Sequence, residues 1–209
     1  MLVLALDTAT PTLVAGVARW SVDGGVEVLA EQSLPSGNRH AELLTPSVRD
    51  VLAAAGLRVR DLDALVVGLG PGPFTGLRVG VVTAATMGDA LGIPVHGVCS
   101  LDAVGDGARS VVTDARRKEV HWAVYGADGQ RLAGPGVVRP EDAPVVDPVL
   151  GDVRFAERLG REVVPAEVTT AGLLRAAVPL FGRPPAPLEP LYLRRPDAVP
   201  PAARKAVSQ

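Results

Sequence analysis

The sequence predicts an α/β fold in which helices pack on a mixed five-stranded β-sheet, followed by a smaller second unit. In the first hundred residues, near-continuous apolar runs typical of central strands alternate with apolar residues at helical spacing. Apolar residues make up 47% of the 209-residue chain and aromatic residues only 3%, so the core is expected to consist of Val, Leu and Ala. The alternation restarts in a weaker form after Gly105.

The first three predicted strands form an antiparallel meander. They cover residues 2–7, 12–19 and 26–33 and are separated only by short turns. A helix is expected between residues 38 and 55, with Gly56 as its C-cap. Pro46 allows two interpretations: either Thr45 caps a helix that begins at Pro46, or the helix begins near His40 and bends.

The rest of the first unit continues the alternation. A strand at 62–70 leads into a glycine-rich loop, a helix over about 75–91 and a short strand at 93–98. The predicted order is therefore β-β-β-α-β-α-β, a mixed sheet covered by helices.

The second unit contains shorter elements. Strands are expected at 108–115, 119–126 and 137–138, and helices at 153–159 and 169–177. Thirteen of the 19 prolines lie after residue 130, which shortens these elements. We expect a first domain over 1–104, a smaller second domain over 105–190 and a proline-rich tail over 191–209. The sequence leaves open whether this tail folds back on the first domain.

Charge and cysteine content narrow the classes of protein. The net charge of −2 argues against nucleic acid as the sole partner. The single cysteine, Cys99, cannot form a disulfide within the chain and is interpreted as a small core residue. No basic segment precedes the first apolar run, and no apolar run approaches the roughly 18 residues of a membrane span. A soluble cytoplasmic protein is expected.

The loop GLGPGPFTGLRVG, residues 68–80, looks at first like a phosphate-binding loop. A Walker loop requires Lys and Ser or Thr after its last glycine, where this chain has Leu77 and Arg78. Pro71 and Pro73 each remove a backbone N–H that a phosphate cradle would use. With Thr75 as N-cap, the amides that follow leave a weak phosphate contact open. We interpret the loop mainly as a strand-to-helix corner.

Small residues recur every four positions along the second predicted helix, at Gly76, Gly80, Ala84 and Gly88. This spacing places them on one ridge that carries almost no side chain. Since each internal glycine costs about 1 kcal/mol of helix stability relative to alanine, another backbone is expected to approach closely. The ridge could pack against the chain's own sheet or first helix, or against a helix of a partner protein.

Candidate catalytic groups are few. His40, His96 and His121 are scattered and form no metal-binding pair. Asp7 ends the first strand and Thr8 follows it; a carboxylate at that position could hold Mg²⁺ near a phosphate or could cap the following turn. Asp114 ends a strand in the same way, but bulky arginines follow it.

Six segments, in this order along the chain, resemble the bacterial TsaB family: LALDTAT, NRHAELLTP, GLGPGPFTGLRVG, GVCSLDAV, DARRKEV and PLYLRRPDA. The resemblance implies an actin-like, sugar-kinase and heat-shock-protein type (ribonuclease H-like) fold with two related domains. It also implies a non-catalytic partner of the TsaD subunit, with TsaE as third member. That complex transfers a threonylcarbamoyl group to the adenosine adjacent to the anticodon of tRNAs that read codons beginning with A.

The resemblance further implies homodimers that pair through the two helices of the first domain. On this chain the implied interface residues are His40, Leu43, Ser47, Gly76, Gly80, Ala84, Met87 and Gly88. No catalytic residue, no metal and no cofactor of its own are expected, and tRNA would be contacted mainly through the complex. Asp7, Thr8, Thr75 and Gly76 are weak candidates for nucleotide contact.

Two other functions compete with this interpretation. A small ATP-dependent phosphotransferase of the same superfold is favoured by Asp7 and Thr8, but a second glycine-rich phosphate hairpin is missing from the sequence. A metallopeptidase is disfavoured because the three histidines are not paired.

Overall fold

The structure is a computed structural model that describes residues 1–194. Its first sheet has the order β3-β2-β1-β4-β5. The strands are β1 (Leu2–Asp7), β2 (Thr12–Ser21), β3 (Gly25–Pro35), β4 (Ala64–Gly68) and β5 (Val95–Val98). β1, β2 and β3 pair antiparallel, whereas β4 and β5 run parallel to β1. The predicted mixed five-stranded sheet is confirmed.

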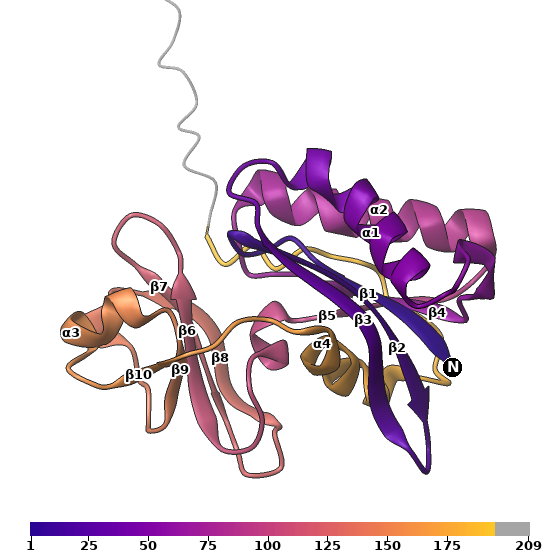
Figure 1. Ribbon diagram of the computed structural model, residues 1–209. Coiled ribbons are helices and arrows are strands. Elements are labelled where there is room, and N and C mark those ends of the chain that lie inside the picture. Colours follow the sequence, from indigo (N-terminus) through magenta and orange to yellow (C-terminus); the bar gives the residue numbers. More distant parts are fainter. Residues whose placement is uncertain (195–209) are drawn as a thin grey trace, which may run out of the picture.

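Two long helices cover one face of this sheet (Figure 1). They are α1 (His40–Ala54) and α2 (Phe74–Leu91). α1 begins at His40 and contains Pro46, so the helix starts where the second of the two interpretations placed it. α2 begins at Phe74 with Pro73 in the N-cap position and no side-chain cap, so the prediction of Thr75 as N-cap was wrong. Pro73 suits this position because its missing N–H would have no partner there anyway.

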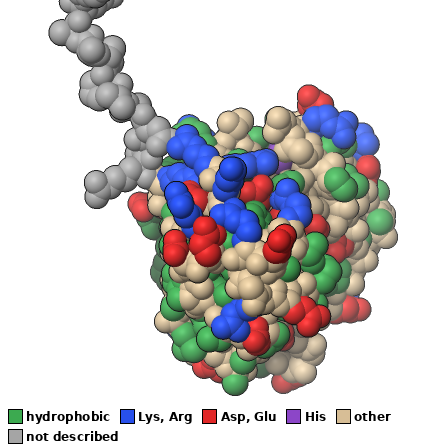
Figure 2. Space-filling view, turned by 90° about the vertical axis from the view of Figure 1, so that its left-hand side faces the viewer, with side chains coloured by type: hydrophobic (Ala, Val, Ile, Leu, Met, Phe, Trp, Pro, Cys, Tyr) green, Lys and Arg blue, Asp and Glu red, His purple; other side chains and the backbone are tan. Residues whose placement is uncertain are grey.

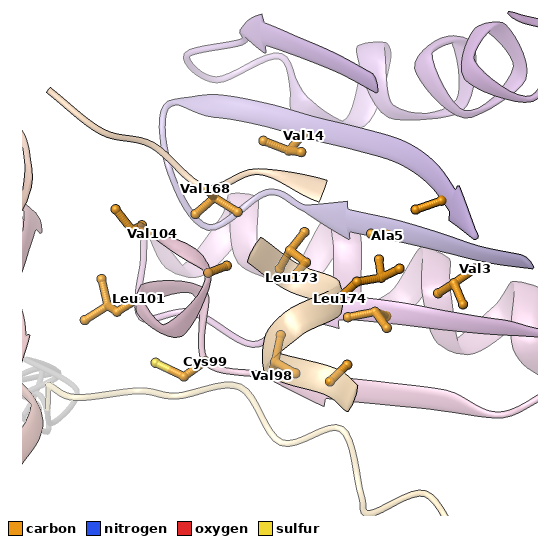
Figure 3. Packing of buried hydrophobic residues seen from close by; sticks show 14 of the residues in the cluster. Val3, Ala5, Val14, Val98, Cys99, Leu101, Val104, Val168, Leu173 and Leu174 are labelled. Carbon is orange, nitrogen blue, oxygen red and sulfur yellow. The ribbon is translucent and has the colours of Figure 1, made fainter. Parts of the chain in front are cut away.

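A short helix, α4 (Thr170–Ala177), covers the opposite face of the first sheet, although it follows the second sheet in the sequence. Alternation along β1 directs Val3 and Ala5 toward α4, where they share a buried cluster with Leu173 and Leu174 (Figure 3). Leu4 and Leu6, which alternate with them along β1, point to the opposite face, toward α1 and α2. The first sheet is therefore the middle of three layers.

The second sheet has the order β8-β7-β6-β9-β10, which repeats the order of the first. Its strands are β6 (Arg109–Asp114), β7 (Val120–Tyr125), β8 (Arg131–Val138), β9 (Val149–Gly151) and β10 (Val163–Pro165). Its helices are reduced to single turns and the four-residue α3 (Ala156–Leu159). The repeated topology makes the chain two versions of one unit, and it confirms the predicted fold class.

The segment 188–194 returns to the first domain. The Leu191 N–H donates to the Leu69 carbonyl at 2.8 Å, and Leu188 packs against the core beneath α1 and α2. Arg194 then pairs with Glu119 of the second sheet's hairpin. The described start of the predicted tail thus folds back and links both domains, while residues 195–209 lie outside the described part. Across residues 1–194, no helix has the length and apolarity that a bilayer span requires.

Candidate functional site: the cleft between the two domains

The glycine-rich loop joins β4 to α2 at the carboxyl end of the first sheet. A Cβ on Gly72 would lie 1.9 Å from the Ala9 carbonyl oxygen, so the turn after β1 occupies the space of a side chain. Gly70 adopts φ +91°, which side-chain-bearing residues rarely adopt. The loop glycines therefore serve a tight strand-to-helix corner against the first hairpin, as interpreted from the sequence.

Asp7 is fully buried, and its carboxylate is already bound inside the protein. It accepts hydrogen bonds from the Ser100 hydroxyl at 2.5 Å and from the Ala9 N–H at 2.8 Å. Burial raises the pKa of Asp7, and these hydrogen bonds oppose that shift only in part. A Cβ on Gly68 would overlap this carboxyl group. Asp7 thus connects β1, β4 and the segment after β5 inside the protein and does not face the cleft between the sheets. We call Asp7 and the neighbouring Thr8 the internal brace.

Thr8 explains the bare ridge of α2. Its hydroxyl donates to the Gly76 carbonyl at 2.8 Å and accepts from the Gly80 N–H at 2.9 Å, so it spans one turn of the helix backbone. A Cβ on Gly80 would lie 2.6 Å from this oxygen. Only a helix without side chains at these positions lets the hydroxyl come so close.

The rest of the ridge is covered in the same way. Ala84 is fully buried, and a Cβ on Gly88 would meet the Val95 side chain at 2.2 Å. The expectation that the ridge faces a partner is therefore corrected: it packs against the chain's own β1 and β5. Of the other expected interface residues, His40 and Ser47 are also buried, and His40 binds the Thr10 carbonyl at 2.8 Å.

A groove of about 440 Å³ lies on the outside between α1 and α2. We call it the helix-pair groove. Of the residues expected at the partner interface, Met87 lines this groove and Leu43 is half-buried. The groove is defined by Thr45, Val48, Arg49, Leu52, Ala53, Leu57, Arg58, Val59, Thr83 and Met87.

A second hollow region separates the two sheets. One pocket of about 430 Å³ lies at the start of α2 and is lined by Thr10, Thr75, Gly76 and Arg116 among others. Of the four weak candidates for nucleotide contact, Thr75 and Gly76 therefore reach the cleft. Asp7 and Thr8 do not reach it, because both are buried in the internal brace.

A neighbouring pocket of about 670 Å³ shares Pro73, Phe74 and Arg116 with the first. We call it the cleft pocket. Three segments build it: residues 72–74 at the start of α2, the β6–β7 hairpin, and residues 191–194 of the returning chain. Its size is typical of small-molecule sites.

The β6–β7 hairpin has an unusual backbone at the mouth of the cleft. Arg116, Arg117 and Lys118 have φ values of +63°, +54° and +64°. Left-handed geometry costs roughly 1–2 kcal/mol for each residue that carries a side chain. Asp114 supports the turn by accepting from the Arg116 N–H at 2.7 Å. Three consecutive strained residues typically mark a functional segment.

His121 on β7 is 91% buried and lines the cleft pocket. Desolvation lowers its pKa to about 4, while the charge of Asp114 opposes this shift, so the ring is neutral near pH 7. Among the hydrogen bonds of residues 1–194, none involves the His121 ring. The other histidines lie elsewhere, His40 beside Thr10 and His96 against Phe181. Within that same part of the chain, no three His, Cys, Asp or Glu side chains gather as a metal site would require.

Sequence reasoning missed the aromatic lining of the cleft pocket. Phe74 and Tyr192 stack with their ring centroids 4.9 Å apart, although 118 positions separate them in the chain. The signal in the sequence was the scarcity of aromatic residues, because two of only seven such side chains lie here. Both rings are about half exposed to solvent, whereas large aromatic side chains are on average highly buried.

Comparisons with known proteins identify a matching family model and several relatives of this chain. A family model described as TsaD, tRNA N6-adenosine threonylcarbamoyltransferase, matches residues 28–160. An uncharacterized protein of Mycobacterium tuberculosis is 51% identical over 207 residues, which cover 95% of this chain and 94% of that protein. The tRNA threonylcarbamoyladenosine biosynthesis protein TsaB of Escherichia coli is 35% identical over 136 residues, covering 61% of this chain and 56% of the E. coli protein.

Solved structures agree with these sequence matches. YeaZ from Pseudomonas aeruginosa superposes with a TM-score of 0.68 at 27% identity, covering 84% of this chain and 90% of that structure.

An uncharacterized Mycobacterium leprae protein is 53% identical, and the match covers 95% of this chain but 56% of that protein. The chain thus spans little more than half the length of its M. leprae and E. coli relatives.

Proposed function

We propose, because this chain belongs to the TsaB family, that it takes part in tRNA threonylcarbamoyladenosine biosynthesis as a non-catalytic scaffold or activator subunit. Its role is to bind and order a TsaD-like catalytic subunit. That subunit transfers the threonylcarbamoyl group to the adenosine next to the anticodon of tRNAs that read codons beginning with A. A TsaE-like ATPase is the third member of the assembly, and any nucleotide or metal that the reaction needs is held by the partners.

The observation that carries the non-catalytic role is the internal brace at the end of β1. Asp7 and Thr8 are the residues best placed by sequence for phosphate chemistry, yet both are buried with their polar atoms bonded inside the chain. A carboxylate that binds Mg²⁺ needs free oxygen lone pairs facing the ligand. The brace supports a structural use of these two residues.

The helix-pair groove is the surface that we assign to protein partners. Its floor is apolar, with Val48, Leu52 and Met87, and Arg49 and Arg58 lie at its edge. Apolar centres with charged edges are typical of protein interfaces. A second copy of the chain and the TsaD-like subunit would use the same helices, so homodimer and heterodimer are expected to compete.

Contact with tRNA is assigned mainly to the assembly and not to this chain alone. The net charge of −2 supports this division, because proteins that bind nucleic acid alone usually carry a basic excess.

The test is co-purification with the TsaD-like protein of the same cell, followed by a tRNA modification assay with and without this chain. Ala53→Arg places a long charged side chain in the helix-pair groove. The matched control is Ala85→Arg, at an exposed position of α2 that does not line the groove. We expect Ala53→Arg to lower complex formation and modification at least tenfold, while Ala85→Arg leaves both near the parent level.

Two results would contradict the proposal. One is modification that proceeds at an unchanged rate without this chain. The other is turnover by the isolated chain, either threonylcarbamoyl transfer or ATP-dependent phosphorylation of a small acceptor. Equal loss of complex in both arginine variants would contradict the assignment of the groove while leaving the subunit role intact.

A further inference from the structure

The cleft pocket has the shape and the lining of a ligand site that the proposed function does not use. It has a volume of about 670 Å³ and lies between the two domains, where ligand sites preferentially occur. It is distinct from the helix-pair groove, with which it shares no lining residue. It also lies outside the internal brace of Asp7 and Thr8, neither of which lines it.

One wall is a rigid aromatic platform. Phe74 and Tyr192 are 53% and 43% exposed and stack at an interplanar angle of 28°. Arg78 holds both rings: its guanidinium lies 3.7 Å from the Phe74 centroid, and its Nε donates to the Tyr192 hydroxyl at 2.9 Å. Exposed aromatic rings that are held in place cost little conformational entropy when another planar ring stacks on them.

The charged residues that line the pocket are two arginines and one aspartate, Asp114, with which Arg116 pairs at 3.4 Å. Arg116 and Arg194 line it, and the strained turn that contains Arg116 adds Lys118 beside it. Arg154 approaches from the neighbouring β9–α3 connection and pairs with Asp114 at 3.5 Å. Figure 2 views the molecule from the side of the second sheet and shows Lys and Arg side chains gathered on the upper part of that face, with acidic groups between them. Guanidinium groups bind phosphate through two parallel hydrogen bonds.

One lining residue of the pocket, His121, has a ring that makes no hydrogen bond within residues 1–194. His121 is 91% buried and lines the pocket, and a buried polar side chain normally has a hydrogen-bond partner. A neutral imidazole offers one donor and one acceptor. The edge of a heterocyclic base offers the complementary pair.

From these observations we propose that the cleft pocket binds a nucleotide unit, with its base stacked on the face of Tyr192 that Phe74 leaves free, its edge hydrogen-bonded to His121, and its phosphate held at Arg116 and Arg194. The unit is either a free mononucleotide or an unstacked residue of a single RNA strand, since both present one base and one phosphate. This site is independent of the partner role, because it uses neither the helix-pair groove nor a second subunit.

The experiment is a titration of the purified full chain, without partners, by calorimetry or fluorescence. The ligands are the four ribonucleoside monophosphates, adenosine, inorganic phosphate, a short single-stranded RNA and an RNA duplex. Saturable binding of a mononucleotide identifies a free nucleotide as the ligand. Binding of single-stranded RNA without binding of any mononucleotide identifies a residue of a strand. Both results support the site, and adenosine and phosphate alone should each bind at least tenfold more weakly.

Variants locate the binding. Tyr192→Leu removes the exposed ring and should weaken binding about 5- to 100-fold. Arg116→Asn removes a charge while keeping a residue that tolerates positive φ, and should weaken binding about 5-fold or more. The matched control is Arg19→Asn, which removes an exposed arginine from β2, away from the pocket. His121→Phe keeps the ring volume, removes the hydrogen-bonding edge and should flatten the preference among bases.

The site is refuted if the folded chain binds none of the nucleotides or RNAs at millimolar concentration. It is also refuted if Arg19→Asn weakens binding as much as Arg116→Asn, because the interaction would then follow net charge alone. Equal affinity for phosphate and mononucleotide, or a preference for the duplex, would contradict the proposed stacking of a base on the aromatic platform. None of these results depends on whether the chain binds a TsaD-like subunit.

Discussion

Replacement of Gly80 by alanine should destabilise the protein, although alanine is the better helix former. The intrinsic preference of a helix for alanine would add about 1 kcal/mol of stability. The new Cβ, however, would lie 2.6 Å from the Thr8 hydroxyl oxygen inside the protein. Overpacking of this kind costs about 1–3 kcal/mol. The displaced hydroxyl also strains its bonds to Gly76 and Gly80, each worth roughly 0.5–1.5 kcal/mol.

The net expectation is a loss of about 2 kcal/mol. For a chain of this size, that lowers the Tm by about 4–8 °C. The assay is thermal unfolding followed by circular dichroism, with urea unfolding as a second measurement of the free energy. Ala85→Gly, at an exposed position of the same helix, calibrates the intrinsic preference and should cost about 1 kcal/mol.

A double-mutant cycle with Thr8→Ala tests the cause. Without the hydroxyl there is room for the Cβ, so Gly80→Ala should change sign and stabilise the Thr8→Ala protein by up to about 1 kcal/mol. The reasoning fails if Gly80→Ala raises the Tm of the parent protein, or if its effect is the same in both backgrounds. Because this position controls the stability of the monomer, a large residue there cannot serve as a clean test of partner binding.

Three further outcomes follow from other buried groups. Asp7→Asn should leave the fold intact, with a Tm equal to or above that of the parent. The reason is that burial raises the pKa of Asp7, which means that its charged form destabilises the folded state; a clear fall in Tm would contradict this. His121 has a folded pKa of about 4 against 6.5 unfolded, so the unfolded state binds its proton first as the pH falls. The free energy of unfolding should drop by roughly 3 kcal/mol between pH 6.5 and pH 4 on its account, and His121→Gln should show a drop smaller by that amount in urea titrations. Gly16→Ala should lower the Tm by several degrees, because its Cβ would overlap the Thr170 hydroxyl at 1.9 Å and push α4 away from the sheet. The double variant Gly16→Ala with Thr170→Gly should recover part of this loss. An unchanged Tm in the single variant would contradict the packing of α4 on the first sheet.

The sequence predicted the first sheet and its two helices well because their signals are local. The near-continuous apolar run in residues 2–7 reflects burial on both faces of the strand, and helical spacing in 74–91 reflects which face of the helix is buried; neighbouring residues carry that information. The second sheet was predicted less completely, since β9 and β10 have three residues each and leave no periodic signal.

The residues of the candidate sites were predicted only in part. The four-residue spacing of small residues along α2 correctly indicated a close approach of another chain segment. Which segment approaches is decided by Thr8, 72 positions away from Gly80, and no local pattern encodes that pairing. The exposed groove on the other side of the helix pair could be identified only once the covered side was known.

What the sequence by itself determined is the set of local conformations and the small residues at which a close approach is sterically allowed. Only the tertiary structure decided what makes that approach: the hydroxyl of Thr8, directly after β1, at the ridge of α2, and Tyr192 of the returning chain against Phe74. The physical reason is that a missing side chain removes a steric barrier without selecting the group that fills the space. That selection depends on the free energy of packing the whole chain, to which both sheets and the returning segment contribute together.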